Sequence, residues 1–289
     1  MTILVTGAGG GLGRILFESL RSGERGQDVV GVNRSGIGGA DVESCDVTDP
    51  QAVSELVRRV GPQLVFHLAG SFTNSYDIDY PVNALSARYL LEAIDRHAFG
   101  ARVVLAGSAA EYGLVDPQEN PVSESRALRP VSVYGLTKAF QTQIASYFAY
   151  AHRSNVVVAR MFNLMAPGLS ERLFVGRVER LIGRYIRGEV ESISVGHLDH
   201  QRDYVGADEA IAQLRAIASR GEVGGVYNVG SGRPISMRSL LNDMLDAAGV
   251  PNEVVLEAVP EAGGRKGYDV PLIFADMSRT RALLHGGGR

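Results

Sequence analysis

The chain has 289 residues, of which 45% are hydrophobic and 21% charged, and its formal net charge at pH 7 is −3. These values are ordinary for a globular enzyme with a large core, and the lack of a basic excess argues against nucleic acid as the main partner. The one cysteine, Cys45, excludes an intrachain disulfide, and no apolar run approaches the roughly 20 residues of a membrane span. Since no secretory signal is recognisable at the N-terminus, we expect a cytoplasmic protein that binds neither nucleic acid nor a membrane.

Residues 1–13 predict a dinucleotide-binding turn. Thr2 to Val5 are apolar or β-branched, as in a short buried strand, and a glycine-rich turn then leads into residues with helical spacing. The missing side chains let backbone N–H groups and the helix N-terminus approach a pyrophosphate. The residues expected to contact the cofactor here are Gly7, Gly10, Gly11, Leu12 and Gly13.

A second buried strand, predicted over residues 28–32, ends at Asn33 and Arg34. At this strand end a carboxylate accepts a hydrogen bond from the ribose 2′-hydroxyl of NAD, whereas arginine accommodates the 2′-phosphate of NADP. No carboxylate stands here, so we predict that the protein prefers NADP (NADPH) to NAD. The alternative is that Arg34 is a solvated loop residue.

Two further strand ends are expected beside the cofactor. Asp46 and Val47 precede a helix that runs to about residue 60, and we expect them at the adenine, although a turn role also explains Asp46. Residues 64–68 predict a third buried strand, in which we interpret His67 as structural. Leu68 is followed by two small residues, Ala69 and Gly70, which leave room for the cofactor to pass.

The alternation of apolar strands with helices predicts an α/β fold, a Rossmann-type doubly wound parallel sheet with a smaller C-terminal substrate-binding lobe. A helix over about 83–99 leads to a fourth strand at 102–106, and a fifth strand is predicted at 156–161. We expect residues 1–165 to form the dinucleotide-binding domain. Residues 166–289 mostly form the second lobe, with about 202–230 returning to the first. Helices predicted at 207–219 and 236–248 flank a strand at 226–229 and are expected to cover the substrate lobe.

The residues that indicate catalysis follow the fourth strand. Ser108 comes at the strand end, and a helix beginning near Val133 carries Tyr134 and Lys138 four residues apart, on one helical face. A lysine ammonium near a phenol lowers the pKa of the phenol, which then exchanges a proton with an alcohol or carbonyl oxygen. Ser108 can hold that same oxygen. A Tyr-x-x-x-Lys spacing is common by chance, but its position behind this strand end favours the catalytic interpretation.

Together these residues resemble the extended short-chain dehydrogenase/reductase family, the NAD(P)-dependent nucleotide-sugar epimerases, dehydratases and reductases. The motifs that carry the resemblance are TGAGGGLG at 6–13, CDVTD at 45–49, HLAG at 67–70, SAAEYG at 108–113, YGLTK at 134–138, ARMFNLMAPG at 159–168, QRDYV at 201–205 and GGVYNVGSGRPISMRSL at 224–240. The second half is most similar to GDP-4-keto-6-deoxy-mannose reductases.

The resemblance implies roles for residues that the pattern alone does not assign. It places Ser108, Tyr134 and Lys138 at the catalytic positions and implies a homodimer formed through the helices that carry Asn83 and Tyr134. Further cofactor contacts implied in this way are Asn83, Ala106, Tyr134, Lys138 and Met161. Implied substrate contacts are Ser108, Ala109, Asn163 and Arg202.

Three chemistries and one non-catalytic role compete within the family. Dehydratases need acidic residues where this chain has Ala109 and Ala110, and Glu111 is shifted by one position, so dehydration is disfavoured. Arg34 favours NADP, and this favours reduction over epimerisation. A reductase must exchange its cofactor in each cycle, whereas an epimerase can retain it. A dinucleotide-sensing role is the least favoured, because the tyrosine and the lysine are both present.

The substrate half is rich in arginine. One or two of these side chains can clamp a nucleotide-sugar diphosphate, whereas a solvated helix face explains the others. They are Arg172, Arg177, Arg180, Arg184 and Arg187. His197 and His200 have a spacing compatible with a metal site, but without a carboxylate or cysteine cluster nearby in the sequence we expect no metal there.

Overall fold

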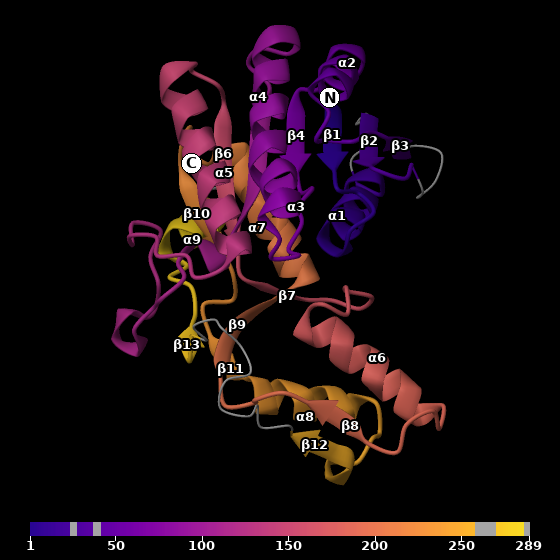
Figure 1. Ribbon diagram of the computed structural model, residues 1–289. Coiled ribbons are helices and arrows are strands. Elements are labelled where there is room, and N and C mark those ends of the chain that lie inside the picture. Colours follow the sequence, from indigo (N-terminus) through magenta and orange to yellow (C-terminus); the bar gives the residue numbers. More distant parts are fainter. Residues whose placement is uncertain (24–27, 37–41, 258–269, 286–289) are drawn as a thin grey trace.

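A parallel sheet of seven strands forms the centre of the computed structural model, which describes residues 1–23, 28–36, 42–257 and 270–285 (Figure 1). The strands, in spatial order, are β10 (Val226–Val229), β6 (Val156–Met161), β5 (Arg102–Ser108), β4 (Leu64–His67), β1 (Thr2–Thr6), β2 (Asp28–Asn33) and β3 (Val42–Ser44). The chain builds the sheet outward from β1 in one direction and then returns to build it from β4 in the other. In such sheets the ligand lies where the order reverses, at the carboxyl ends of β1 and β4.

Helices cover both faces of this sheet, because its central strands are apolar on both sides. On one face lie α2 (Pro50–Val60), α4 (Ser86–His97) and α5 (Val133–Ala151). On the other lie α1 (Gly11–Arg21) and α7 (Ala207–Arg220). The Rossmann-type fold predicted from the alternation of strands and helices is therefore confirmed.

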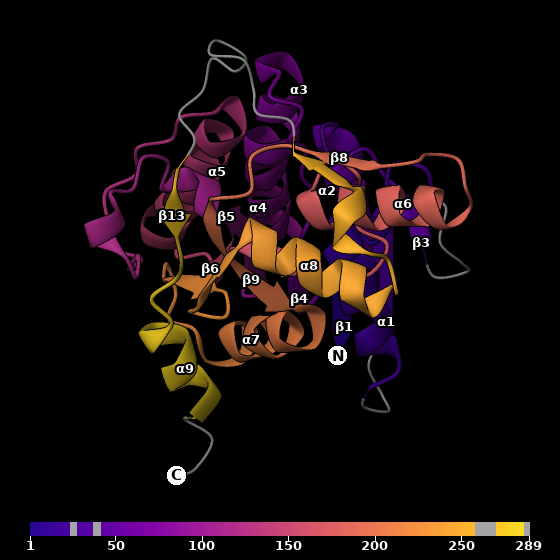
Figure 2. The ribbon, with the colours of Figure 1, turned by 90° about the horizontal axis from the view of Figure 1, so that it is seen from below.

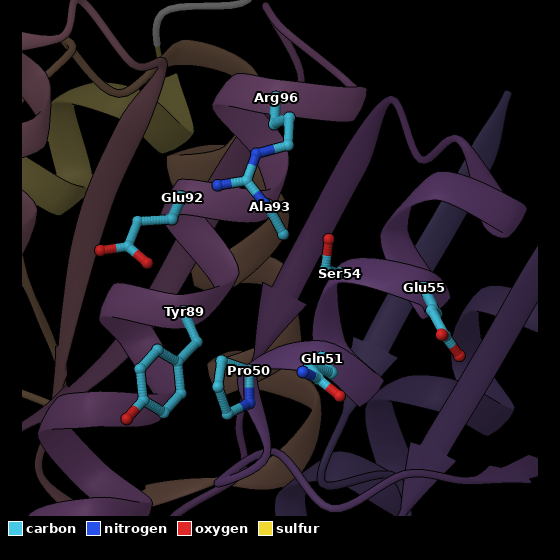
Figure 3. A pocket seen from close by; sticks show the side chains of 8 residues that line it. All are labelled: Pro50, Gln51, Ser54, Glu55, Tyr89, Glu92, Ala93 and Arg96. Carbon is cyan, nitrogen blue, oxygen red and sulfur yellow. The ribbon is translucent and has the colours of Figure 1, made fainter.

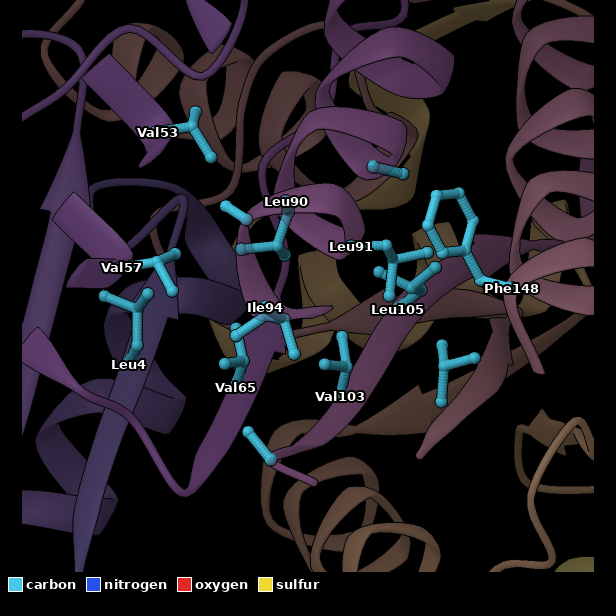
Figure 4. Packing of buried hydrophobic residues seen from close by; sticks show 14 of the residues in the cluster. Leu4, Val53, Val57, Val65, Leu90, Leu91, Ile94, Val103, Leu105 and Phe148 are labelled. Atoms are coloured by element: carbon cyan, nitrogen blue, oxygen red, sulfur yellow. The ribbon is translucent and has the colours of Figure 1, made fainter. Parts of the chain in front are cut away.

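Side chains from successive strand positions enter opposite cores. Leu4 is buried with the helices α2, α4 and α5, while its neighbours Ile3 and Val5 are buried with α1 and α7. In Figure 4, Leu91 and Ile94 of α4 lie over the strands of the sheet. Burial of these side chains from water is the main stabilising contribution to the fold.

The position of α7 differs from our expectation. We expected residues 207–219 to cover the substrate lobe, although they fall within the stretch of about 202–230 that we assigned to the first domain. Ile211, Leu214 and Ile217 are buried in the same core as the strands of the main sheet. Amphipathic spacing shows that a helix has an apolar face, and it does not show which surface that face covers. The last described helix, α9 (Ser278–His285), lies beside α7 and β10.

The segment between β4 and β5 also differs from the single helix expected over about 83–99. It contains α3 (Tyr76–Tyr80), a turn of π-helix, η1 (Pro81–Leu85), and then α4. Pro81 has no N–H to continue the ordinary helical ladder, and the N–H of Ser86 bonds to the carbonyl of Pro81 instead. The π turn carries Asn83, a residue expected at the site. The edge strand β3, only three residues long, was not expected at all.

The smaller lobe lies beyond the carboxyl ends of the sheet and is seen from below in Figure 2. Its strands are β7 (Asn163–Met165), β8 (Ile193–Val195), β9 (Gln201–Gly206), β11 (Pro234–Ser236), β12 (Val255–Glu257) and β13 (Leu272–Ile273). In this lobe β9 pairs with β7, β11 and β13, and β8 pairs with β12. Its helices are α6 (Phe174–Ile186) and α8 (Met237–Ala247), which share an apolar core.

Short 3₁₀ turns complete the described structure. They are η2 (Ala109–Glu111), η3 (Pro117–Glu119) and η4 (Asn252–Val254). Of these, η2 follows directly from β5 and so begins at the edge of the sheet where the ligand site is expected. None of the helices in the described ranges is long and apolar enough to cross a membrane.

Candidate functional site

The turn between β1 and α1 is built so that only glycine fits at two of its positions. Gly7 has φ +73°, and a Cβ added there would lie 2.7 Å from the backbone nitrogen of Ala69. A Cβ on Gly13 would lie 2.0 Å from the carbonyl oxygen of Gly7. Gly10 begins α1 without a side-chain cap, and it is exposed. The first N–H groups of α1 are thus open to an anion, so the turn fits the pyrophosphate of a dinucleotide.

The end of β2 lies directly against this turn. A Cβ on Gly9 would come within 2.7 Å of the side-chain nitrogen of Asn33, and the carbonyl oxygen of that side chain accepts from the N–H of Gly36 at 2.6 Å. Arg34, the next residue, is exposed. The structure therefore places Asn33 beside the glycine turn, and Arg34 follows it in the chain and lies near Asp46.

Asp46 has the turn geometry that we considered as its alternative role. Its Oδ1 accepts from the N–H and the hydroxyl of Thr48, at 2.9 and 2.7 Å. These hydrogen bonds lower the pKa of Asp46, with a smaller contribution from the charge of Arg34. Asp46 and Arg34 therefore lie on the same side of the site. Val47, half-buried, follows Asp46.

His67 of β4 links β1 to the π turn η1 through hydrogen bonds of its ring. Its Nδ1 lies 2.8 Å from the hydroxyl of Thr6, and its Nε2 lies 3.0 Å from the hydroxyl of Ser86. Ser86 donates its proton to the carbonyl of Val82, so it must accept from Nε2–H, and Nδ1 must then accept from Thr6. Thr6 accepts in turn from the N–H of Ala69. Burial lowers the pKa of His67 to about 3, with a contribution from the charge of Lys138, so the ring is neutral.

Asn83 holds the loop after β4 against α5. Its side-chain oxygen accepts from the N–H of Ser71 at 2.9 Å, while its amide donates to the carbonyl of Ser71 and the hydroxyl of Thr137. A Cβ on Gly70 would lie 3.3 Å from the Asn83 oxygen and 3.4 Å from the Lys138 nitrogen. Asn83 therefore lies immediately behind Gly70 and Lys138.

Ser108, Tyr134 and Lys138 come together from two elements. Ser108 ends β5, and Tyr134 and Lys138 occupy the first two turns of α5. Tyr134 and Ser108 are joined by a side-chain hydrogen bond. The Lys138 ammonium donates to the carbonyl of Ala106 and to the side chain of Gln141, each at 2.8 Å. Three groups suited to proton transfer thus lie at one strand end.

The electrostatics of these groups differ from our expectation. We expected Lys138 to lower the pKa of Tyr134, but burial raises that pKa, and the main opposing effect is the hydrogen bond from Ser108. Burial also lowers the pKa of Lys138 to about 8, against the charges of Glu111 and Asp79. At neutral pH the phenol is therefore protonated, and the lysine keeps most of its charge. A neutral phenol is a proton donor, which suits addition of a proton to a carbonyl oxygen.

The other expected contacts occupy neighbouring strand ends. Met161 ends β6, paired in register with Ser108, and Ala109 follows Ser108 in η2. Asn163 and Arg202 lie on β7 and β9 of the smaller lobe, and the side chain of Asn163 donates to the carbonyl of Asp203. The remaining expected residues lie at the turns already described: Gly11, Leu12, Leu68 and Ala69.

Sequence reasoning missed the loop that covers Tyr134. The ring of Phe72 meets the Tyr134 ring edge-on, at 5.9 Å between centroids, and the Arg172 guanidinium lies 6.0 Å from the Phe72 centroid. The buried carboxylate of Asp79 organises the loop, accepting from Ser71, Thr73 and Asn74 through their N–H or hydroxyl groups. The signal was the run of donor residues Ser-Phe-Thr-Asn-Ser just before a helix with an aspartate in its first turn.

Most of the arginines in the substrate half form ion pairs on the surface. Arg180 pairs with Glu171, and Arg184 and Arg187 pair with Glu189. A solvated helix face explains these three. Arg172 differs from them because it approaches Phe72 and hence the site.

Two other features lie apart from this constellation. His197 lies 3.6 Å from Glu257 and 3.7 Å from Asp199, and no group of three or more metal-ligating side chains is arranged for a metal in the described ranges. A hollow of about 330 Å³ between α2 and α4 is lined in part by Pro50 and Tyr89 (Figure 3). It shares no residue with the glycine turn or with the three catalytic candidates.

Known proteins of one family resemble this chain. The family model described as NAD dependent epimerase/dehydratase family matches residues 3–230. GDP-6-deoxy-D-mannose reductase of Pseudomonas aeruginosa is 27% identical, over 73% of this chain and 71% of the relative. UDP-glucose 4-epimerase of Streptomyces lividans is 28% identical, over 97% of this chain and 89% of the relative. The solved structure of RMD from Pseudomonas aeruginosa complexed with NADPH has a TM-score of 0.85 at 22% identity, over 98% of this chain and 92% of that chain, so it has the same fold.

The neutral state of His67 predicts a specific dependence of stability on pH. Below pH 6.5 the histidine of the unfolded chain takes up a proton, whereas the folded chain does not until about pH 3. Stability present above pH 6.5 is therefore lost as the pH falls, by about 2 kcal/mol between pH 7 and pH 5. In His67→Gln the free energy of unfolding should fall by about 2 kcal/mol less than in the wild type between pH 7 and pH 5. Urea unfolding at both pH values measures this difference.

His285→Gln, which changes an exposed histidine at the end of α9, serves as the control and should retain the wild-type dependence. An equal loss in wild type and His67→Gln would contradict the neutral state of the His67 ring in the folded chain.

Proposed function

We propose that this chain, which belongs to the NAD dependent epimerase/dehydratase family, is an NADPH-dependent reductase of a nucleotide-diphosphate 4-keto-6-deoxyhexose. The observation that carries the proposal is the state of Tyr134. Burial raises the pKa of its phenol against the opposing effect of the hydrogen bond from Ser108, so the phenol keeps its proton at neutral pH and can donate it. The similarity to GDP-6-deoxy-D-mannose reductase supports the choice of substrate class.

The residues of the site divide the reduction among them. The glycine turn and the first N–H groups of α1 would hold the cofactor pyrophosphate, and Lys138 would bind the ribose. When bound there, NADPH would supply a hydride to the carbonyl carbon of the sugar. Ser108 holds the carbonyl oxygen, and Tyr134 gives it a proton, so that the ketone becomes a secondary alcohol. The charge of Lys138 stabilises the phenolate that Tyr134 becomes, until solvent restores the proton.

Dehydration lacks its acid in this site. Ala109 and Ala110 stand where dehydratases of the family carry acidic residues, and the carboxylate of Glu111 is buried against Arg160 rather than facing the catalytic residues. An epimerase remains the second candidate, supported by the similarity to UDP-glucose 4-epimerase, because it uses the same serine, tyrosine and lysine.

The direct test is turnover of a keto-sugar. We expect the purified protein to consume NADPH stoichiometrically with a nucleotide-diphosphate 4-keto-6-deoxyhexose, as followed by nicotinamide absorbance. Tyr134→Phe should lower kcat at least about 100-fold, the contribution of a positioned general acid. The matched control is Tyr150→Phe, a change at an exposed tyrosine of the same helix, which should leave kcat unchanged. Inversion of the sugar without net loss of NADPH would overturn the reductase proposal and support the epimerase.

We assign the preference for NADPH over NADH to Arg34, which is exposed and directly follows Asn33. Loss of a charged hydrogen bond to the 2′-phosphate should lower kcat/KM for NADPH about tenfold in Arg34→Ala, with little change for NADH. Steady-state kinetics with each cofactor measure this difference. Arg58→Ala, at an exposed position of α2, is the control. An equal loss with both cofactors would show that Arg34 does not distinguish them.

The exposed face of α4 and α5 supports the expected homodimer. Phe140 and Tyr147 of α5 are 37% and 58% exposed, and both line a groove with Tyr80 between the two helices. Large apolar side chains at helical spacing on a surface are typical of a protein–protein interface.

We expect the wild-type protein to sediment at about twice the mass of its 30.9 kDa chain. The double variant Phe140→Glu/Tyr147→Glu should sediment as a monomer, because it places charges on this face. Ile186→Glu, at an exposed position of the smaller lobe, should leave the mass unchanged. A wild-type monomer would refute the assignment.

A further inference from the structure

The most completely buried ion pair in the described structure lies directly behind the catalytic serine. Glu111 of η2 and Arg160 of β6 have side chains that are 0% and 2% exposed, and their closest atoms are 2.9 Å apart. Arg160 also lies over the ring of Tyr112, 4.6 Å from its centroid. A carboxylate buried this deeply must be matched by donors, and the identity of those donors indicates its role.

The carboxylate of Glu111 receives donors from the elements that build the site. Oε1 accepts from the backbone N–H of Ser108 at 2.7 Å. Oε2 accepts from the hydroxyl of Thr142 at 2.7 Å and from Nε and Nη2 of Arg160 at 3.1 and 2.9 Å. Ser108 ends β5, Thr142 belongs to the helix that carries Tyr134 and Lys138, and Arg160 belongs to β6. One carboxylate therefore connects the strand of the catalytic serine to the helix of the catalytic tyrosine.

The surroundings leave no freedom for another arrangement. A Cβ on Gly107 would lie 2.6 Å from Oε1 of Glu111, so the glycine before Ser108 leaves the space that the carboxylate occupies. The hydroxyl of Ser108 also accepts from the N–H of Ala110 at 3.2 Å, which closes η2 around the serine. Both the backbone and the hydroxyl of Ser108 are thus held by the turn that Glu111 anchors.

We propose that Glu111 is a positioning residue, which with Arg160 sets the place of Ser108 relative to Tyr134 through the Ser108 backbone N–H. The acidic residue of this loop then acts through the serine and does not itself exchange protons with the substrate. The inference rests on the proposed function for its effect on turnover, but the anchoring of Ser108 is a property of the protein alone.

The charge of Glu111 supports this role. It opposes the effect of burial on the pKa of Lys138, and it adds to the rise in the pKa of Tyr134. The other titratable groups that face Lys138 are Asp79 of α3 and His67 of β4. Removing the charge while keeping the acceptor of the Ser108 N–H should therefore lower the pH at which Lys138 loses its proton, an effect that a purely structural residue would not produce.

Two variants test the anchor. In Glu111→Leu/Arg160→Met the ion pair becomes apolar with similar volume, a replacement that buried ion pairs often tolerate, but Ser108 loses its acceptor. We expect hydrogen exchange at the Ser108 amide to accelerate at least tenfold, and kcat to fall at least tenfold with unchanged affinity for NADPH. Glu111→Gln keeps an oxygen for the Ser108 N–H but loses the oxygen that accepts from Arg160 and Thr142. It should therefore unfold more easily than the wild type, while the folded protein keeps the slow exchange and most of kcat at pH 7. On the alkaline side of the pH profile, the activity of Glu111→Gln should begin to decline at a lower pH than the activity of the wild type.

The matched control is Glu119→Gln, which removes the charge from a carboxylate paired with Arg126. It should change neither the exchange at Ser108 nor the pH profile. Wild-type exchange at Ser108 in the folded double variant, or accelerated exchange with unchanged kcat, would overturn the proposal. If the double variant does not fold, an unchanged alkaline limb in Glu111→Gln would overturn it. A wild-type protein that reduces no keto-sugar would refute the function, while the exchange measurement would still decide whether Glu111 anchors Ser108.

Discussion

The parallel pairing of β1 with both β2 and β4 is the constraint on which the rest of the structure depends. Because all three strands point the same way, their carboxyl ends meet at one edge, and the chain must leave that edge in opposite directions on the two sides of β1. The glycine turn follows β1, and the loop held by Asp79 follows β4. The proton-transfer residues follow the next strand along. These three segments lie close together because they follow neighbouring parallel strands, which end at the same edge of the sheet.

Prediction from the sequence succeeded where a short segment carries its own signal. The strands at 156–161 and 226–229 match β6 and β10 to the residue, because both are rich in valine and lie in a sheet buried on both faces. The family was recognisable from contiguous motifs, and the family model confirms it. What failed depended on distant partners. The apolar face of α7 did not by itself show which surface it covers, and Pro81 gave no indication of a π turn rather than a helix end.

The candidate site shows the same division. The serine, tyrosine and lysine that we propose as catalytic were singled out from the sequence by their residue types and spacing, and the fold brings them to one strand end. Their electrostatics were not identifiable from the sequence, because the pKa of Tyr134 depends on how deeply the phenol is buried and on its hydrogen bond with Ser108. Likewise, Glu111 was visible in the sequence only as an acid one position out of place. Its four donors come from residues as far away as Arg160, which only the fold brings near.

The path of the chain between the lobes limits how the protein can change. The smaller lobe is assembled from separate stretches, and its central strand β9 runs at Gly206 straight into α7, which belongs to the core of the main sheet. The lobe is therefore not an exchangeable module, since no single cut removes it and no single insertion supplies it. A relative with another sugar specificity cannot donate its lobe by recombination. New specificity in such a protein has to arise by substitution within loops that the shared sheet already holds in place.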